Sequence, residues 1–124
     1  MQYLSILLAA FVIAVSATVS AAADPVTSGE YFITQSWSQE EAFKRPYFVN
    51  VPNRFENKRL PVFVFLHGNG ADAKEALRGF RRGRKTIASQ YIMVFPQGYR
   101  ESWNIVSERS KADDCRFIEA IVAE

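Results

Sequence analysis

Apolar and polar positions along the chain predict strands and helices in alternation. Tyr31 to Thr34, followed by Trp37, predicts a first short strand, and Pro46 to Pro52, where apolar and polar residues partly alternate, predicts a second. These two strands should pair antiparallel at the start of a sheet. Two continuous apolar runs follow, over residues 61–66 and 91–95. Because these runs are rich in β-branched and aromatic residues, they predict strands that are buried on both faces.

The segment between the two continuous runs, Ala71 to Gln90, has apolar residues at helical spacing. Gly79 and Gly83 interrupt the pattern, which predicts two short helices or one broken helix. A strand, a helix and a second apolar strand form a βαβ unit, so the two strands should be parallel and joined by a right-handed crossover.

A last helix is predicted to start between Ser110 and Asp114, where Ser and Asp side chains can cap free backbone N–H groups. The apolar face of this helix consists of Phe117, Ile118, Ile121 and Val122. The sequence stops at Glu124 within this pattern, without the Gly, Asn or Pro that usually ends a helix.

The first 23 residues contain no charged side chain and end in the small residues Ser20 to Ala23, as in a signal peptide. The apolar stretch is short for a membrane span, which needs about 20 residues. We therefore expect residues 1–23 to be a signal peptide and residues 24–124 to be a secreted domain, extracellular or periplasmic, with no stable membrane association after cleavage. An uncleaved N-terminal anchor is the alternative.

The composition excludes several classes of function. Fifteen Lys and Arg against 13 Asp and Glu give a net charge of +2, which is too near neutral to predict nucleic-acid binding. The single cysteine, Cys115, cannot form an internal disulfide, and we expect it to be a small buried residue. No metal-ligand spacing, phosphate loop or nucleotide motif is present, so the sequence predicts no cofactor.

The candidate chemistry lies where the first continuous apolar run ends, at His67-Gly68-Asn69-Gly70. Glycines allow the backbone to turn sharply off a strand so that successive N–H groups point at one spot. In acyl-transfer enzymes such groups stabilise the oxyanion of a tetrahedral intermediate, by about 3–4 kcal/mol per donor. The motif alone is weak, and the buried strand before it makes it more specific.

Five blocks, in this order along the chain, carry a resemblance to a known family: Leu60-Pro61-Val62, Leu66-His67-Gly68, Phe95-Pro96-Gln97-Gly98, Ser102-Trp103-Asn104, and Asp113-Asp114 with Phe117-Ile118. From about Tyr47 to its last residue, the chain resembles secreted poly(3-hydroxybutyrate) depolymerases and feruloyl-esterase-like α/β-hydrolases. The resemblance implies an α/β-hydrolase fold, three-layer with a mostly parallel sheet. It also implies a serine esterase acting on a polyester or a plant cell-wall ester.

The resemblance also implies roles for individual residues. Gly68 or Asn69 would supply the oxyanion-hole N–H groups, while His67 and Gly70 would shape the loop. Trp103 and Asn104 are candidates for lining the cleft near the strand ends, with a packing role for Trp103 as the alternative.

The catalytic serine, acid and histidine of that family are not present. None of the ten serines has a Gly two positions before it, and His67 is the only histidine. We therefore expect an N-terminal part of an esterase domain, truncated before the nucleophile elbow, in which Asp113 and Asp114 cap a helix. The alternatives are a non-catalytic secreted binding module and the remnant of a broken gene.

Two further expectations concern surfaces. The resemblance implies that the strand ending at Leu66 lies between the 91–95 strand and the missing nucleophile strand, so residues 62–66 should form an unpaired apolar edge. The one basic cluster comprises Arg78, Arg81, Arg82, Arg84 and Lys85. It is predicted to be a solvated helix face, with a site for acidic polymers or cell-surface glycans as the alternative.

Overall fold

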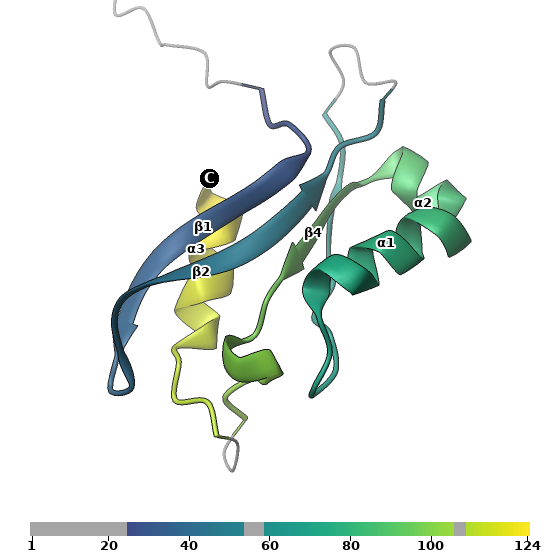
Figure 1. Ribbon diagram of the computed structural model, residues 1–124. Helices are drawn as coiled ribbons and strands as arrows, with labels where there is room; N and C mark the ends of the chain where they lie inside the picture. Colours follow the sequence, from purple (N-terminus) through teal and green to yellow (C-terminus); the bar gives the residue numbers. More distant parts are fainter. Residues whose placement is uncertain (1–24, 54–58, 106–108) are drawn as a thin grey trace, which may run out of the picture.

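A computed structural model describes residues 25–53, 59–105 and 109–124 (Figure 1). Its elements, in chain order, are β1 (Gly29–Trp37), β2 (Glu40–Asn50), β3 (Val62–Val64), α1 (Ala73–Gly83), α2 (Lys85–Gln90), β4 (Ile92–Pro96), the 3-10 turn η1 (Tyr99–Glu101) and α3 (Asp114–Ala123). The predicted signal peptide lies outside the described residues. No helix in the described part of the chain is long and apolar enough to cross a membrane.

The four described strands form one sheet in the order β1-β2-β4-β3. β1 pairs with β2 and β2 with β4 antiparallel, whereas β3 pairs with β4 in parallel. The parallel β3–β4 pair and the antiparallel start of the sheet are confirmed. The expectation of a mostly parallel sheet is wrong for the described strands, because two of the three pairings, β1–β2 and β2–β4, are antiparallel.

β2 starts at Glu40, well before the predicted start at Pro46. The hairpin turn after Trp37 allows this extension: the Ser36 hydroxyl accepts a hydrogen bond from the Ala42 amide, and Ala42 itself has a φ of 49°. The four charged residues Glu40, Glu41, Lys44 and Arg45 concealed this half of the strand, because its alternation is visible only once the hairpin partner is known.

The sheet separates two layers of helices (Figure 1). α1 and α2 cover the face that carries Phe48, Met93 and Phe95. α3 covers the opposite face, where Phe117 and Ile121 pack against Tyr47, Val49 and Val94. Neighbouring strand residues therefore serve opposite cores, as the two-residue period of a strand requires.

The helices follow the predicted pattern. Residues 73–90 form two helices that meet at Arg84, and the side chain of Asp72 caps the first by accepting from the Glu75 amide at 2.8 Å. Asp113 caps α3 by accepting from the Arg116 amide at 3.1 Å. Both observations confirm the expected helix starts.

β3 lies at the edge of the described sheet, and its outer side is open. Val62 and Leu66 are 55% and 51% exposed, so the expectation of burial on both faces is wrong for this strand, whereas the expectation of an apolar edge is confirmed. Val122 on α3 is also exposed. Cys115 lies on the solvent side of α3, which corrects its expected burial.

The open edge predicts self-association, because an unpaired apolar strand is a template for further pairing. We expect the isolated chain to elute from a size-exclusion column as oligomers or to precipitate. Val62→Lys places a charge on the edge and should shift the protein toward monomer.

Val26→Lys is the matched control, since Val26 is similarly exposed but lies outside the sheet. A wild-type monomer with a sharp, cooperative melting transition would contradict the prediction.

Candidate functional site

The candidate site lies at the carboxyl ends of the two parallel strands, β3 and β4. Because β3 and β4 run in the same direction, the loop after β3 (residues 65–72) and the loop after β4 (residues 97–98, followed by η1) leave the sheet at one edge. In open α/β sheets, ligands bind outside the carboxyl ends of the strands. The candidate motif identified in the sequence, His67 to Gly70, therefore lies at such an edge.

The imidazole of His67 links these two loops. The ring is buried, its Nε2 accepts from the Gly98 amide at 2.9 Å, and its Nδ1 lies 2.7 Å from the Gly68 carbonyl oxygen. A nitrogen that accepts from an amide carries no proton, so Nδ1 must carry it and donate to the carbonyl. His67 is thus a neutral structural residue with both nitrogens in use.

Gln97 reinforces the link between the same loops. Its Oε1 accepts from the Ala73 amide at the start of α1 at 2.8 Å, and its Nε2 donates to the Ala71 carbonyl at 3.4 Å. The Gln97 side chain thereby connects the end of β4 to the start of α1. This fixes the far end of the loop that His67 fixes at its near end.

Trp103 supports the loop from a third segment. Its indole N–H donates to the His67 carbonyl oxygen at 2.8 Å, and its ring lies 5.1 Å from the imidazole, centroid to centroid. The sequence blocks around His67, Gln97 and Trp103 therefore meet at one place. The three blocks therefore have a common structural role, because each supplies a contact to the same loop.

Four successive backbone amides of the loop divide into two pairs. Gly70 donates to the Glu101 carbonyl at 2.8 Å, and Ala71 donates to the Gly68 carbonyl at 3.1 Å. Gly68 and Asn69 are exposed, and their amides have no acceptor within the described part of the chain. Gly70 has a φ of +76°, which favours glycine. The loop therefore presents two consecutive N–H donors to solvent.

The partner of Gly70 belongs to an unusual turn. Arg100 and Glu101 both have left-handed backbone angles, with φ of 51° and 58°. Such conformations cost about 1–3 kcal/mol each in non-glycine residues and persist where surrounding contacts impose them. Here the turn points the Glu101 carbonyl at the Gly70 amide, so the strain is linked to the geometry of the loop.

Asn104 and Asp114 extend the network toward α3. Asp114 Oδ2 accepts from the Asn104 amide at 2.5 Å, and the Asn104 side chain donates to the Ala112 carbonyl at 3.2 Å. Asp114 Oδ1 pairs with Arg45 Nη2 at 2.6 Å. Of the two aspartates expected to cap α3, only Asp113 does so; Asp114 instead pairs with a buried cation.

Arg45 is the important residue that the sequence analysis missed. Its side chain is fully buried, stacks over the Phe117 ring at 3.8 Å and donates to Gln35 Oε1 at 3.0 Å. Burial lowers the pKa of the guanidinium, and the hydrogen bond and charge of Asp114 oppose that shift. The Nε of Arg45 is buried without a partner in the described structure.

A signal for Arg45 does exist in the sequence. Phe43, Arg45, Tyr47 and Val49 alternate along β2, so the period that places Tyr47 and Val49 in the core also places Arg45 there. A buried arginine requires a carboxylate partner. The acidic pair at Asp113-Asp114 offered one.

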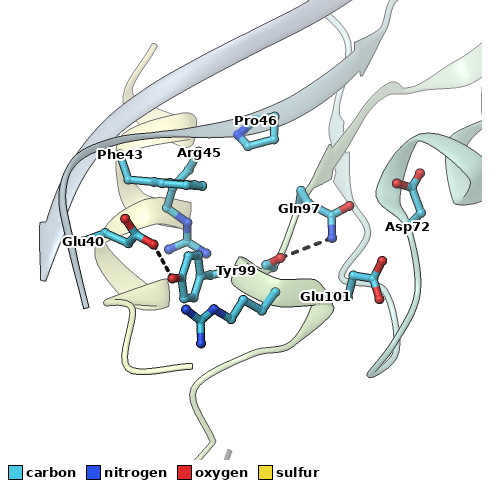
Figure 2. A pocket seen from close by; sticks show the side chains of 10 residues that line it. Glu40, Phe43, Arg45, Pro46, Asp72, Gln97, Tyr99 and Glu101 are labelled. Atoms are coloured by element: carbon cyan, nitrogen blue, oxygen red, sulfur yellow. Dashed lines mark hydrogen bonds between the residues drawn. The ribbon is translucent and has the colours of Figure 1, made fainter. Parts of the chain in front are cut away.

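A cavity of about 470 Å³ lies beside the loop, and Figure 2 shows its side chains converging from β2, from Asp72 just before α1 and from the segment after β4. The residues that line it are Glu40, Phe43, Arg45, Pro46, Asp72, Gln97, Gly98, Tyr99, Arg100 and Glu101. The Tyr99 phenol donates to Glu40, and this bond raises the pKa of Tyr99. The lining mixes aromatic, acidic and basic groups, so it suits a polar ligand better than an apolar one.

The structure thus brings His67, Gly68, Asn69, Gly70 and Trp103 together. Trp103 has the packing contacts that the alternative interpretation expected, and Asn104 joins the loop to α3. None of Gly68, Asn69, Trp103 and Asn104 belongs to the lining of the cavity beside the loop. Their part in an oxyanion hole and a cleft stays a prediction.

The close approach at Gly98 predicts a sharp steric effect. A Cβ at this position would overlap the Ser102 carbonyl oxygen and lie 3.3 Å from His67 Cε1. Gly98→Ala should therefore destabilise the fold by about 1–3 kcal/mol, the usual cost of overpacking. Urea unfolding monitored by circular dichroism measures the change.

Gly79→Ala is the control for this substitution. Gly79 lies within α1 with open space around it, so alanine there should stabilise the fold by about 0.5–1 kcal/mol. Equal unfolding midpoints for the two variants would show that the packing at Gly98 is not as described.

Comparison with known proteins gives no family for this chain. The chain matches no protein-family model and no curated protein. The functional assignment therefore depends on the geometry of the loop and on the motifs that form it.

Proposed function

We propose that this chain supplies the oxyanion-stabilising part of a secreted serine ester hydrolase, of the poly(3-hydroxybutyrate) depolymerase or feruloyl-esterase-like kind. The observation that carries the proposal is that Gly68 and Asn69 are exposed and that their amides have no acceptor among the described residues. Both residues follow β3, one strand of the parallel pair. They belong to a loop that is held by hydrogen bonds of His67, Gln97 and Trp103.

The chemistry needs donors that are already in position. When a nucleophile attacks an ester, the carbonyl oxygen becomes negatively charged, and donors that need not reorganise stabilise it most. His67, Gln97 and Trp103 provide that rigidity here. His67 ties the loop to the Gly98 amide, and Gln97 and Trp103 donate to loop carbonyls from two other segments. In this proposal these three residues position the loop and do not touch substrate.

The strand arrangement supports the same family. The resemblance implies that the strand before the loop lies between the β4 strand and the nucleophile strand. β3 does neighbour β4, and the opposite edge of β3 is open. The proposal is therefore an α/β-hydrolase domain in which the nucleophile strand would pair with β3.

The nucleophile and base must come from sequence outside these 124 residues. The only histidine uses both ring nitrogens in the loop, and no serine has the Gly-x-Ser spacing. Polyester, feruloyl-sugar and acetyl-xylan esters remain candidate substrates, and export depends on the predicted leader.

The test has two parts. The purified 124-residue chain should not hydrolyse p-nitrophenyl butyrate above a heat-treated control, because an oxyanion loop without a nucleophile accelerates hydrolysis weakly at most. Fusion of residues 24–124 to the nucleophile-bearing part of a related hydrolase should restore turnover.

A matched pair of variants of the fusion tests the amide at residue 69. Asn69→Pro removes the N–H and should lower kcat by about 10²-fold or more. Asn69→Ala keeps the N–H and should change kcat little. A folded but inactive fusion, or equal kcat for the two variants, would contradict the proposal and favour a non-catalytic binding module. Turnover by the unfused chain that is lost on mutation of one of its own serines would also contradict it.

A further inference from the structure

The end of α1 and the start of α2 form a strongly basic surface, away from the proposed oxyanion loop. This α1–α2 basic face consists of Arg78, Arg81, Arg82, Arg84 and Lys85, all of them exposed. α1 packs on the sheet through Ala73, Ala76, Leu77 and Phe80. The basic side chains are therefore on the side of the helix that faces solvent, and they account for five of the 15 Lys and Arg of the sequence.

The positive charges on this face are almost unneutralised. Arg78 pairs with Glu75 on its own helix, and no other member of the face has an ion pair within the described residues. On α1, Arg78 is three residues before Arg81 and four before Arg82, spacings at which like charges on a helix repel. A helix selected only for stability would alternate acidic and basic residues at these spacings.

The helix dipole explains only part of the cluster. Arg81 and Arg82 lie in the last turn of α1, where a positive charge is favourable. Arg84 is both the C-cap of α1 and the N-cap of α2, and Lys85 begins α2, where the positive end of the helix makes further positive charge unfavourable. The accumulation of charge across the junction therefore has no structural benefit that accounts for all five residues.

The arginines also form a concave surface. Arg78, Arg81 and Arg82 line an open hollow of about 340 Å³. Positions three and four apart on a helix lie about 5–6 Å from one another, and a planar guanidinium donates to sulfate or carboxylate oxygens in pairs. Exposed single ion pairs are weak in water, so binding requires an anion with many charges along its length.

The surroundings of the face favour a polysaccharide over a nucleic acid or a membrane. Single-stranded nucleic acids stack on exposed aromatic side chains, and the aromatic residues of this region, Phe80 and Tyr91, pack in the core. Membrane-surface helices insert large apolar side chains, and none of the exposed large apolar residues of the described chain lies on α1 or α2.

We propose that the α1–α2 basic face binds an acidic polysaccharide through its sulfate or carboxylate groups. This site is separate from the proposed ester-hydrolase loop: the loop precedes the N-terminus of α1, whereas the basic face begins at Arg78, about 8 Å along the helix, and continues past its C-terminus. Binding here would concentrate the protein on a charged polymer without using the loop.

The test compares two charge-matched double variants of the whole protein. Arg81→Gln with Arg82→Gln removes two charges from the face and keeps its helix propensity. Lys44→Gln with Lys111→Gln removes two exposed charges elsewhere. Titration with a fluorescent heparin octasaccharide probes sulfate groups, and titration with oligogalacturonate probes carboxylates.

We expect the face variant to bind one or both probes about tenfold more weakly and the control variant to bind within about twofold of wild type. The slope of log Kd against log salt should fall by roughly one to two for the face variant only. Binding of neither probe, equal weakening in both variants, or tighter binding of oligo(dT) or of phosphatidylserine vesicles than of either saccharide would overturn the proposal.

Discussion

The buried imidazole of His67 is the contact on which the rest of the site depends. It bonds to the backbone after both parallel strands, accepting from Gly98 and donating to Gly68. Gln97 supplies a second link between the same two loops by donating to the Ala71 and Gly98 carbonyls. An unpaired amide or carbonyl in this position would cost about 1–3 kcal/mol, so the neutral ring stabilises the junction and sets its geometry. The exposure of the Gly68 and Asn69 amides follows from that geometry.

A second network, centred on the Arg45–Asp114 ion pair, connects the contacts of His67 to α3 on the other face of the sheet. Arg45 on β2 pairs with Asp114 at the start of α3, and Asp114 also accepts from the Asn104 amide. The adjacent Trp103 then donates to the His67 carbonyl. A buried ion pair contributes little net stability by itself, but it penalises any arrangement that separates its partners. It therefore specifies where the Trp103 segment lies.

The hydrophobic periodicity of the sequence predicted most strands and helices, but it did not predict which of their residues are buried. Apolar runs identified β3 and β4, and Asp72 and Asp113 follow capping rules that act locally. The early start of β2, the burial of Arg45 and the exposure of Cys115 depend on partners far away in sequence. The burial of β3 was predicted wrongly because a strand's own residues do not show whether a neighbour lies on each side.

The most direct test of the account is an NMR titration of the ¹⁵N-labelled Val62→Lys variant, whose sheet edge should not self-associate, with acetate, a small carboxylate that mimics the oxyanion. The amide signals of Gly68 and Asn69 should shift and saturate together, while those of Gly70 and Ala71 should not respond, because these two amides already donate within the protein. Shifts of all four signals alike, or of none, would contradict the claim that the loop presents two fixed and unoccupied donors.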